Sequence, residues 1–210
     1  MTKIFIADDH ALIREGLKKI LREETDLTFV GEAQNATETS EKIGSSGADI
    51  LILDLNLPDR AGLDVLRELK GKFPLLRVLI LSMFPEDHFA LRALRAGADG
   101  YLTKDSAPAE LVKALRRISG GGRYVSEAFA DKLVGLVEHG GIEAPHRGLS
   151  DREFEILRLI GAGRSVSEIA AELNLSVSTV NTHRAHILEK MNLHSNADLI
   201  RYAIENKLVE

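Results

Sequence analysis

Short aliphatic runs alternate with segments of helical periodicity through the first 120 residues, and this alternation constrains the fold more than any other feature of the sequence. The expected strands lie at residues 3–7, 28–33, 49–53, 77–82 and 100–103, and the expected helices at 10–22, 37–45, 62–72, 86–96 and 108–119. The interiors of the strands are almost entirely apolar, which is typical of central parallel strands that helices cover on both faces. The pattern therefore predicts an α/β domain with a five-stranded, doubly wound parallel sheet.

The alternation stops at Gly120-Gly121-Gly122, and the residues from there to 147 are typical of a linker. Apolar residues with helical spacing predict one short helix over about residues 126–138. Glycine, proline and other turn-forming residues gather at 139–148. We therefore expect a first domain at 1–120, a linker at 121–147 and a second domain at 148–210. The glycine-rich ends of the linker suit either controlled motion between the domains or a passive tether.

The second domain contains helical patterns and no strand candidate. Ser150 with Glu153, and Ser165 with Glu168, are Ser/Glu pairs with capping-box spacing, so they predict the starts of the first two helices. Two further helices are expected over 177–192 and 197–206. The second domain is therefore expected to be a small all-α module of four helices, in which the second and third form a helix-turn-helix pair.

The composition excludes several classes of protein. Without cysteine the chain has no disulfide framework, no thiolate metal site and no cysteine nucleophile. Its apolar runs are far shorter than the roughly 20 residues of a membrane span. Met1-Thr2-Lys3 leads directly into an expected strand, so we expect a cytoplasmic protein with no signal peptide and no membrane contact. The second domain holds 7 Lys and Arg against 9 Asp and Glu, so any DNA binding must come from a local surface.

Polar residues gather near the carboxyl ends of the expected strands: Asp8, Asp9, Asp54, Ser82 and Lys104. These ends meet at one edge of an open parallel sheet, where ligands bind. Taken singly, each residue is most simply a helix cap or a surface side chain, but five together favour a site. Carboxylate oxygens without histidine or cysteine favour Mg²⁺. An aspartate in this position can also act as a nucleophile toward a phosphoryl group, whose oxygens Lys104 and Ser82 can stabilise.

Four segments of the first domain resemble the receiver domain of bacterial response regulators. They are residues 6–10 (Ile-Ala-Asp-Asp-His), 51–58 (Leu-Ile-Leu-Asp-Leu-Asn-Leu-Pro), 80–82 (Ile-Leu-Ser) and 97–104 (Gly-Ala-Asp-Gly-Tyr-Leu-Thr-Lys). The resemblance covers residues 1 to about 120 and includes every signature element in order. It implies a flavodoxin-like sheet with the strand order 2-1-3-4-5.

The resemblance also assigns roles to the residues of the site. It implies that Asp54 is the phosphoacceptor and that Mg²⁺ is held by Asp8, Asp9, Asp54 and the backbone carbonyl of Asn56. It further implies that Lys104 pairs with the phosphoryl group, and that Ser82 and Tyr101 change position when the group is added. Without the family pattern, Tyr101 would be read as a packing residue.

The expected third helix of the second domain carries residues suited to DNA. Its first turn holds Ser178 and Thr179, whose hydroxyls and nearby backbone N–H groups favour phosphate. Asn181, Thr182 and Ala185 can contact base edges, and His183, Arg184 and Lys190 can donate to the DNA backbone. Hydroxyl-rich helix starts are also ordinary caps, and on the caps alone a protein-docking module would be the better interpretation.

Four segments of the second domain resemble the LuxR-type helix-turn-helix. They are residues 149–153 (Leu-Ser-Asp-Arg-Glu), 169–173 (Ile-Ala-Ala-Glu-Leu), 176–180 (Ser-Val-Ser-Thr-Val) and 183–191 (His-Arg-Ala-His-Ile-Leu-Glu-Lys-Met). Joined to a receiver, this module is similar to response regulators of the NarL/FixJ type. The resemblance places Leu199, Tyr202 and Ala203 at a dimer face on DNA. Family members often carry Lys or Arg where this chain has Asn181, so we expect weak intrinsic DNA affinity and reliance on dimerisation.

The resemblance implies a transcription regulator that a sensor histidine kinase phosphorylates on Asp54. Phosphorylation would favour a homodimer that binds double-stranded DNA at inverted half-sites, and RNA polymerase is a further partner to expect. The receiver would catalyse only its own phosphorylation and dephosphorylation. An aspartyl-phosphate phosphatase is disfavoured because Asn56 cannot transfer protons where such enzymes carry a second aspartate. A receiver that serves only as a protein-interaction module remains an alternative.

Overall fold

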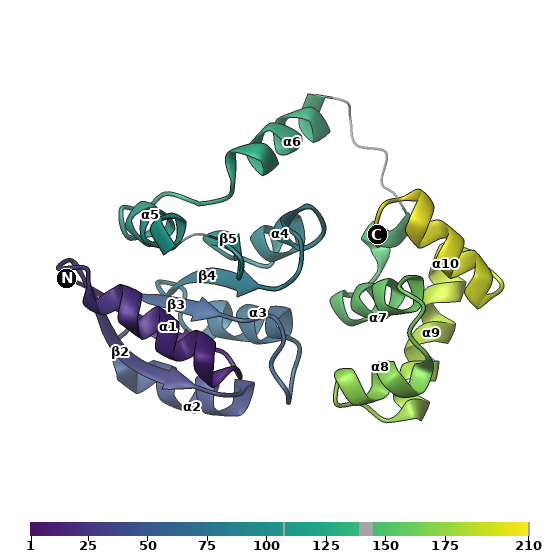
Figure 1. Cartoon of the computed structure of the whole chain (residues 1–210), viewed down its shortest axis with the longest axis horizontal. Helices are drawn as coiled ribbons and strands as arrows, with labels where there is room; N and C mark the ends of the chain where they lie inside the picture. The colour runs from purple at the N-terminus through teal and green to yellow at the C-terminus, as the bar shows by residue number, and fades with distance from the viewer. Residues whose placement is uncertain (107, 139–144, 210) are drawn as a thin grey trace. The chain divides into compact units, whose positions relative to one another are not determined.

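The computed structural model of the chain describes residues 1–106, 108–138 and 145–209 (Figure 1). Its Cα positions divide into two compact units, Met1–Gly135 and Leu136–Glu210. Residues 139–144 of the expected linker lie outside the described residues. Among the described helices, none is both long and apolar enough to cross a lipid bilayer.

Within the described residues of the first unit, five parallel strands form one sheet in the order β2-β1-β3-β4-β5. The strands are β1 (Thr2–Ala7), β2 (Leu27–Ala33), β3 (Ile50–Leu53), β4 (Arg77–Ser82) and β5 (Gly100–Thr103). The helices of this unit are α1 (Ala11–Arg22), α2 (Ala36–Ser46), α3 (Gly62–Lys72), α4 (Glu86–Arg95), α5 (Pro108–Ser119) and α6 (Glu127–Glu138), whose last residues pass the boundary of the unit. The predicted five-stranded doubly wound sheet and its strand order are confirmed.

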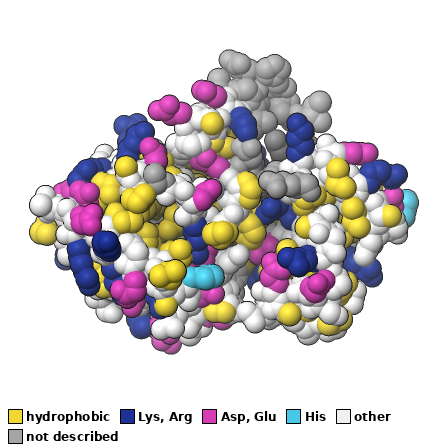
Figure 2. Space-filling model, in the orientation of Figure 1, with side chains coloured by type: hydrophobic (Ala, Val, Ile, Leu, Met, Phe, Trp, Pro, Cys, Tyr) yellow, Lys and Arg dark blue, Asp and Glu magenta, His cyan; other side chains and the backbone are white. Residues whose placement is uncertain are grey.

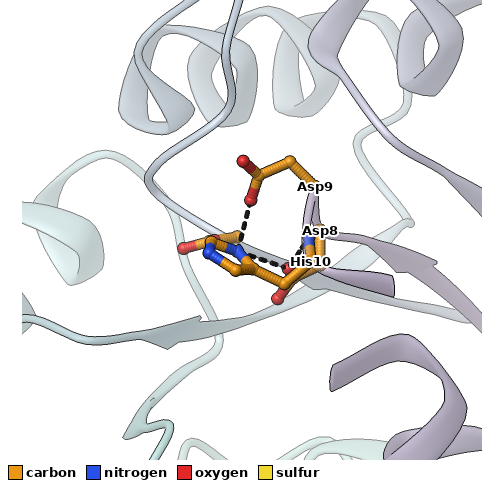
Figure 3. Close-up of side chains that lie close together, drawn as sticks. Asp8, Asp9 and His10 are labelled. Atoms are coloured by element: carbon orange, nitrogen blue, oxygen red, sulfur yellow. Dashed lines mark hydrogen bonds and ion pairs between the residues drawn. The ribbon is translucent and has the colours of Figure 1, made fainter. Parts of the chain in front are cut away.

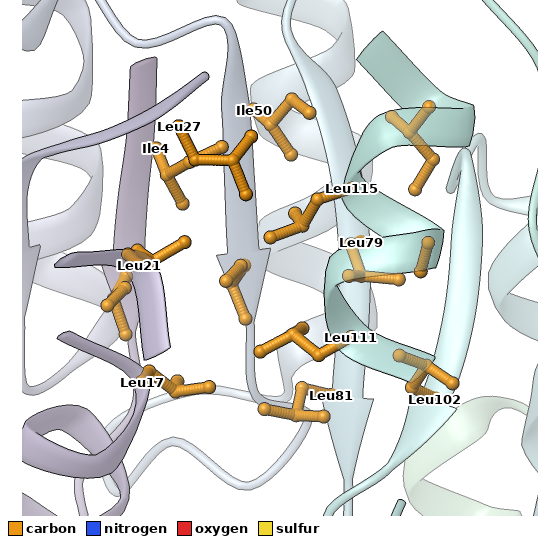
Figure 4. Packing of buried hydrophobic residues seen from close by; sticks show 14 of the residues in the cluster. Ile4, Leu17, Leu21, Leu27, Ile50, Leu79, Leu81, Leu102, Leu111 and Leu115 are labelled. Carbon is orange, nitrogen blue, oxygen red and sulfur yellow. The ribbon is translucent and has the colours of Figure 1, made fainter. Parts of the chain in front are cut away.

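The main core lies between the sheet and the helices α1 and α5 (Figure 4). Leu17 and Leu21 of α1, and Leu111 and Leu115 of α5, pack against strand residues such as Ile50. Every residue of β3 is buried, because helices cover the sheet on both faces. This packing fixes the carboxyl ends of the central strands, where the polar residues gather.

The first unit extends beyond residue 120 because the chain adds one more pairing at the edge of the sheet. Tyr124 lies beside Gly100 in a parallel bridge. The N–H of Tyr101 donates to the carbonyl of Tyr124 at 3.0 Å, and the N–H of Tyr124 donates to the carbonyl of Asp99 at 3.0 Å. Tyr124 and Phe129 are buried. Residues 121–135, expected in the linker, therefore cluster with the first unit.

The second unit is helical over its described residues. Its elements are η1 (Pro145–Gly148), α7 (Asp151–Gly161), α8 (Val166–Glu172), α9 (Val177–Met191) and α10 (Asn196–Glu205). Ser150 and Ser165 each form the predicted capping box with a glutamate three residues later. Asn174 adopts a positive φ of 52° in the turn between α8 and α9, a conformation that asparagine tolerates better than most residues. The predicted helix-turn-helix pair is therefore present.

Candidate functional site

Backbone hydrogen bonds continue past the ends of the central strands and bring the predicted polar residues side by side. The N–H of Asp54 donates to the carbonyl of Ala7 at 2.8 Å, and the N–H of Lys104 donates to the carbonyl of Ser82 at 2.8 Å. Asp8 follows β1 directly, and its N–H donates to the carbonyl of Ala33 at 3.2 Å. These hydrogen bonds bring Asp8, Asp54 and Lys104, which follow β1, β3 and β5, to the same edge of the sheet.

Lys104 bridges the two buried carboxylates of this pocket. Its Nζ lies 2.6 Å from Oδ2 of Asp54 and 2.7 Å from Oδ2 of Asp8. The side chains of Lys104 and Asp8 are 3% exposed and that of Asp54 is 1% exposed. Buried charges at such distances interact strongly because little water screens them. We refer to Asp8, Asp9, Asp54 and Lys104 as the acidic pocket.

His10 joins the acidic pocket at its exposed rim (Figure 3). Its Nδ1 lies 2.6 Å from Oδ1 of Asp9 and 3.4 Å from Oδ1 of Asp8, and its backbone N–H donates to Oδ1 of Asp8 at 2.8 Å. Asp9 and His10 are exposed, whereas Asp8 is buried. The sequence reasoning did not include His10 in the site, although its position directly after the two aspartates was the available signal.

The charges of the acidic pocket suit a divalent cation. Three carboxylates and one ammonium leave a net charge of −2 on Asp8, Asp9, Asp54 and Lys104. Burial raises the pKa of the Asp54 carboxyl, and the two buried carboxylates outweigh burial to raise the pKa of Lys104. The two shifts have different causes: burial acts on Asp54, and the neighbouring carboxylates act on Lys104. One ligand atom from each of Asp8, Asp9, His10 and Asp54 lies within 4.8 Å of the others, so the donor set fits a metal ion.

Hydrogen bonds hold the loop after Asp54 at both of its ends. The N–H of Asn56 donates to Oδ1 of Asp54 at 3.1 Å, and Asn56 pairs with Ala61 in an isolated antiparallel bridge. The N–H of Gly62 donates to the carbonyl of Leu55 at 2.9 Å. A β-carbon at Gly62 would lie 2.5 Å from the carbonyl oxygen of Asp54. Only a glycine therefore allows α3 to start this close to the expected phosphoacceptor.

Asp59 anchors the same loop to another helix. Its carboxylate accepts hydrogen bonds from the backbone N–H groups of Ala36 at 2.7 Å and Thr37 at 2.9 Å, and from the hydroxyl of Thr37 at 2.8 Å. These donors belong to the first turn of α2, where free N–H groups attract a carboxylate. The roles of Gly62 and Asp59 were missed because they depend on contacts that spacing along the chain does not reveal.

Ser82 and Tyr101 are both buried and both contact the backbone of Phe84. The N–H of Phe84 donates to Oγ of Ser82 at 3.2 Å, and the hydroxyl of Tyr101 donates to the carbonyl of Phe84 at 2.8 Å. The ring of Phe84 stacks on that of Phe89 in α4 with centroids 4.4 Å apart. Phe84 therefore connects the two predicted switch residues to α4.

On the face drawn in Figure 2, Lys and Arg side chains are interspersed with Asp and Glu side chains. Helix α9 carries the residues that are predicted to contact DNA. Of its predicted DNA contacts, Ser178, Thr182, Ala185 and Lys190 are exposed, and Thr179, Asn181, His183 and Arg184 are half-buried.

Several of these α9 side chains already have partners within the unit. The amide of Asn181 donates to the carbonyl of Val177 at 3.1 Å, and the hydroxyl of Thr182 donates to the carbonyl of Ser178 at 3.1 Å. Nζ of Lys190 lies 2.7 Å from Oε2 of Glu153, the buried capping residue of α7. A base or phosphate contact that uses the same donor hydrogens would therefore replace an existing interaction.

The expected dimer face on α10 needs correction. Leu199 and Ala203 are fully buried against the rest of the helical unit, and a β-carbon at Gly161 of α7 would lie 2.5 Å from Cβ of Ala203. These two residues therefore contribute no exposed area to a dimer face in this structure, because the apolar stripe of α10 faces its own core. Tyr202 is half-buried, and its hydroxyl lies 2.9 Å from Nδ1 of His146. The exposed large apolar residue of α10 is Ile204, at 58% exposure.

Comparisons with known proteins assign each unit to a described family. Residues 4–116 match the response regulator receiver domain, and residues 147–203 match the bacterial regulatory proteins of the luxR family. The chain is 37% identical to the oxygen regulatory protein NreC of Staphylococcus carnosus over 99% of both chains. It is 32% identical to the response regulator UvrY of Escherichia coli K12, over 99% of this chain and 96% of that protein.

A solved structure is similar over nearly the whole length as well. It is RcsB from Salmonella enterica serovar Typhimurium, bound to the promoter P1flhDC in the presence of the phosphomimetic BeF3⁻. The match has a TM-score of 0.67 and 28% sequence identity, and it covers 96% of this chain and 97% of that one.

Proposed function

Because this chain belongs to the response regulators that join a receiver domain to a LuxR-type DNA-binding domain, we propose that phosphorylation of Asp54 controls its binding to DNA. Its relatives of the NarL/FixJ type place it in a two-component system that regulates transcription. The phosphoryl donor in the proposal is a phosphohistidine of a sensor kinase in the cytoplasm. The observation that carries the proposal is the buried bridge from Lys104 to Asp54 and Asp8 in a pocket of net negative charge.

The proposed reaction is an in-line transfer to the Asp54 carboxylate. A carboxylate oxygen attacks phosphorus, a P–O bond forms, and the P–N bond to the donor imidazole breaks. Lys104 turns from the Asp54 carboxylate to a phosphoryl oxygen, and the Ser82 hydroxyl donates to another. Mg²⁺ would be held by Asp8, Asp9, Asp54 and the carbonyl of Asn56. When bound, it would neutralise negative charge on the transferring group. The receiver acts only on itself, by adding and losing this phosphoryl group.

The proposed output passes through Phe84. When Ser82 turns toward the phosphoryl group, it gives up the hydrogen bond from the N–H of Phe84, and the hydrogen bond of Tyr101 to the same residue must adjust. This change alters the β4–α4 region and favours a homodimer. The dimer places two α9 helices at inverted half-sites in the major groove. RcsB is bound to promoter DNA in the presence of the phosphomimetic BeF3⁻, which supports by analogy a DNA-bound form of the phosphorylated protein. The proposal also includes contact with RNA polymerase.

The test compares wild type with Asp54→Asn, using acetyl phosphate and Mg²⁺. Intact mass, oligomeric state and binding to promoter DNA are read on the same samples. Asp64→Asn is the matched control, because Asp64 is a 59% exposed carboxylate on α3 that pairs with Arg67. Wild type and the control should gain one phosphoryl group, dimerise and bind DNA more tightly, whereas Asp54→Asn should do none of these. If wild type is not modified, or DNA binding ignores the modification, the receiver serves only as an interaction module.

A further inference from the structure

Arg14 is a charged residue on the inner side of α1. Its side chain is only 9% exposed, and Leu17, three residues later on the same helix, belongs to the apolar core. Burying a guanidinium is unfavourable unless its N–H groups are satisfied and its charge is paired. The partners of the Arg14 guanidinium therefore indicate which groups this side chain stabilises.

Those contacts join the first helix to the strand that carries the acidic pocket. Nη1 of Arg14 donates to the backbone carbonyl of Asp8 at 2.8 Å, and this hydrogen bond is buried. Nε of Arg14 donates to Oε2 of Glu32 on β2 at 3.3 Å. Nζ of Lys18 lies 3.2 Å from the same Glu32 oxygen. Arg14 is thus held from one side by Glu32 while it holds Asp8 on the other.

Asp8 needs such a donor because it lies one residue past the end of β1. Its other polar groups are engaged: the N–H with the carbonyl of Ala33, Oδ1 with the N–H of His10, and Oδ2 with Nζ of Lys104. Arg14 provides a donor for the carbonyl beyond the regular strand, so the backbone of Asp8 is fixed on both sides of its side chain. A buried carbonyl left without a donor is unfavourable and would draw the chain toward another conformation.

We propose that Arg14 is a positioning residue for the divalent cation, acting through the backbone of Asp8 to fix the Asp8–Asp9 carboxylates. The inference rests on the proposed function, which supplies the cation. Glu32 has a defined part in it. A lone guanidinium behind the pocket would repel a cation, and Glu32, which Lys18 also contacts, offsets part of that charge, so Arg14 contributes mainly geometry.

The test removes the pair without changing the net charge. The double variant Arg14→Met/Glu32→Gln is compared with wild type by calorimetric titration of the full chain with Mg²⁺. Partners that orient metal ligands typically change metal affinity by about 10–100-fold, so the double variant should bind Mg²⁺ at least about 10-fold more weakly. Phosphorylation by acetyl phosphate should need correspondingly more Mg²⁺, while its rate at saturating Mg²⁺ returns toward the wild-type value.

The chain offers a matched control at the opposite end of the sheet. Nζ of Lys70 donates to the carbonyl of Leu76 at 2.9 Å and to Oδ2 of Asp99 at 2.8 Å. This is the same kind of contact, a cation shared between a backbone carbonyl and a carboxylate, before the start of β4. Lys70→Met/Asp99→Asn should lower the melting temperature measured in EDTA but leave the Mg²⁺ affinity unchanged. A loss of affinity in this control as well would overturn the specific role of Arg14.

The remaining outcomes separate the two proposals. If wild type itself does not bind Mg²⁺, the cation step of the proposed function fails and the inference fails with it. If wild type binds and Arg14→Met/Glu32→Gln binds equally well, only the inference is overturned. If the double variant does not fold, Arg14→Lys replaces it. Lysine keeps the charge but lacks the fork that reaches both acceptors, so wild-type affinity in Arg14→Lys would refute the positioning role.

Discussion

Replacing Gly62 with alanine is expected to slow the phosphorylation of Asp54 far more than it destabilises the receiver unit. The added β-carbon would lie 2.5 Å from the carbonyl oxygen of Asp54 and 2.5 Å from Cα of Leu55. Non-bonded carbon atoms are at their best separation at about 3.5–4.0 Å, so the backbone beside Asp54 must move by about 1 Å. Because the nearest atoms belong to the backbone, a side-chain rotation cannot relieve the contact.

The effect on stability is the difference between two opposing contributions. Forcing a methyl group into a packed site costs about 1–3 kcal/mol. Alanine also restricts the unfolded chain, which returns about 0.4–1 kcal/mol. We expect a net loss of about 1–2 kcal/mol in the free energy of unfolding. A misplacement of about 1 Å at a reacting group can reduce a rate about 100-fold, so we expect phosphorylation to slow by about 10- to 100-fold.

Gly71→Ala is the matched control for this experiment. Gly71 lies on the same helix, and a β-carbon there would meet nothing within 4 Å. We expect this variant to gain up to about 1 kcal/mol of stability and to be phosphorylated at the wild-type rate. The assays are the initial rate of mass gain with acetyl phosphate and Mg²⁺, and chemical unfolding in EDTA. If Gly62→Ala unfolds more easily but reacts at the wild-type rate, the crowding does not reach Asp54 and the reasoning is wrong.

Three further predictions concern the helical unit. Burial raises the pKa of the Glu155 carboxyl, although Arg152 acts to lower it. The contribution of Glu155 to the free energy of unfolding is therefore full below the unfolded pKa of about 4.3, and it is lost as pH rises through the folded pKa. Glu155→Gln should therefore gain stability relative to wild type between pH 4.5 and 7.5 in paired thermal melts, and a constant difference would refute this. Lys190→Met should reduce the slope of log affinity against log salt by about 0.9 if Lys190 contacts phosphate, whereas an unchanged slope would mean that it serves only Glu153. Leu199→Ala should cost about 2–5 kcal/mol of stability. Ile204→Lys should leave the melting temperature unchanged and weaken cooperative binding to paired half-sites. If instead Leu199→Ala weakens cooperative binding and leaves stability unchanged, Leu199 belongs to the dimer face.

The arrangement of the first unit was predictable because two strong patterns agree. Apolar runs alternate with helical segments, and the polar residues at the ends of those runs could meet only at one edge of a parallel sheet. Asp8, Asp54 and Lys104 do meet there. Their mutual distances and burial depend on how the strand ends extend past the regular ladder, and the sequence pattern does not encode that extension.

The features that escaped prediction depend on contacts between distant segments. The pairing of Tyr124 with Gly100 extends the receiver unit past the glycine run, although glycines usually indicate a boundary. Leu199 and Ala203 have the spacing of an apolar stripe, and periodicity cannot tell whether such a stripe faces its own core or a partner. Arg14 looks like a surface charge until the carbonyl of Asp8 is located beside it.

The hydrogen bonds that Asn181 and Thr182 make within α9 affect how strictly the protein would discriminate between related DNA sequences. A protein rejects wrong partners most strongly when a mismatch leaves its polar groups without partners. Here the Asn181 amide and the Thr182 hydroxyl are already hydrogen-bonded to carbonyls of their own helix. If α9 reads base edges, each mismatch then carries a penalty near the low end of the usual range of about 1–3 kcal/mol. Operators should therefore form a graded series of related sequences, filled in order as the concentration of active protein rises.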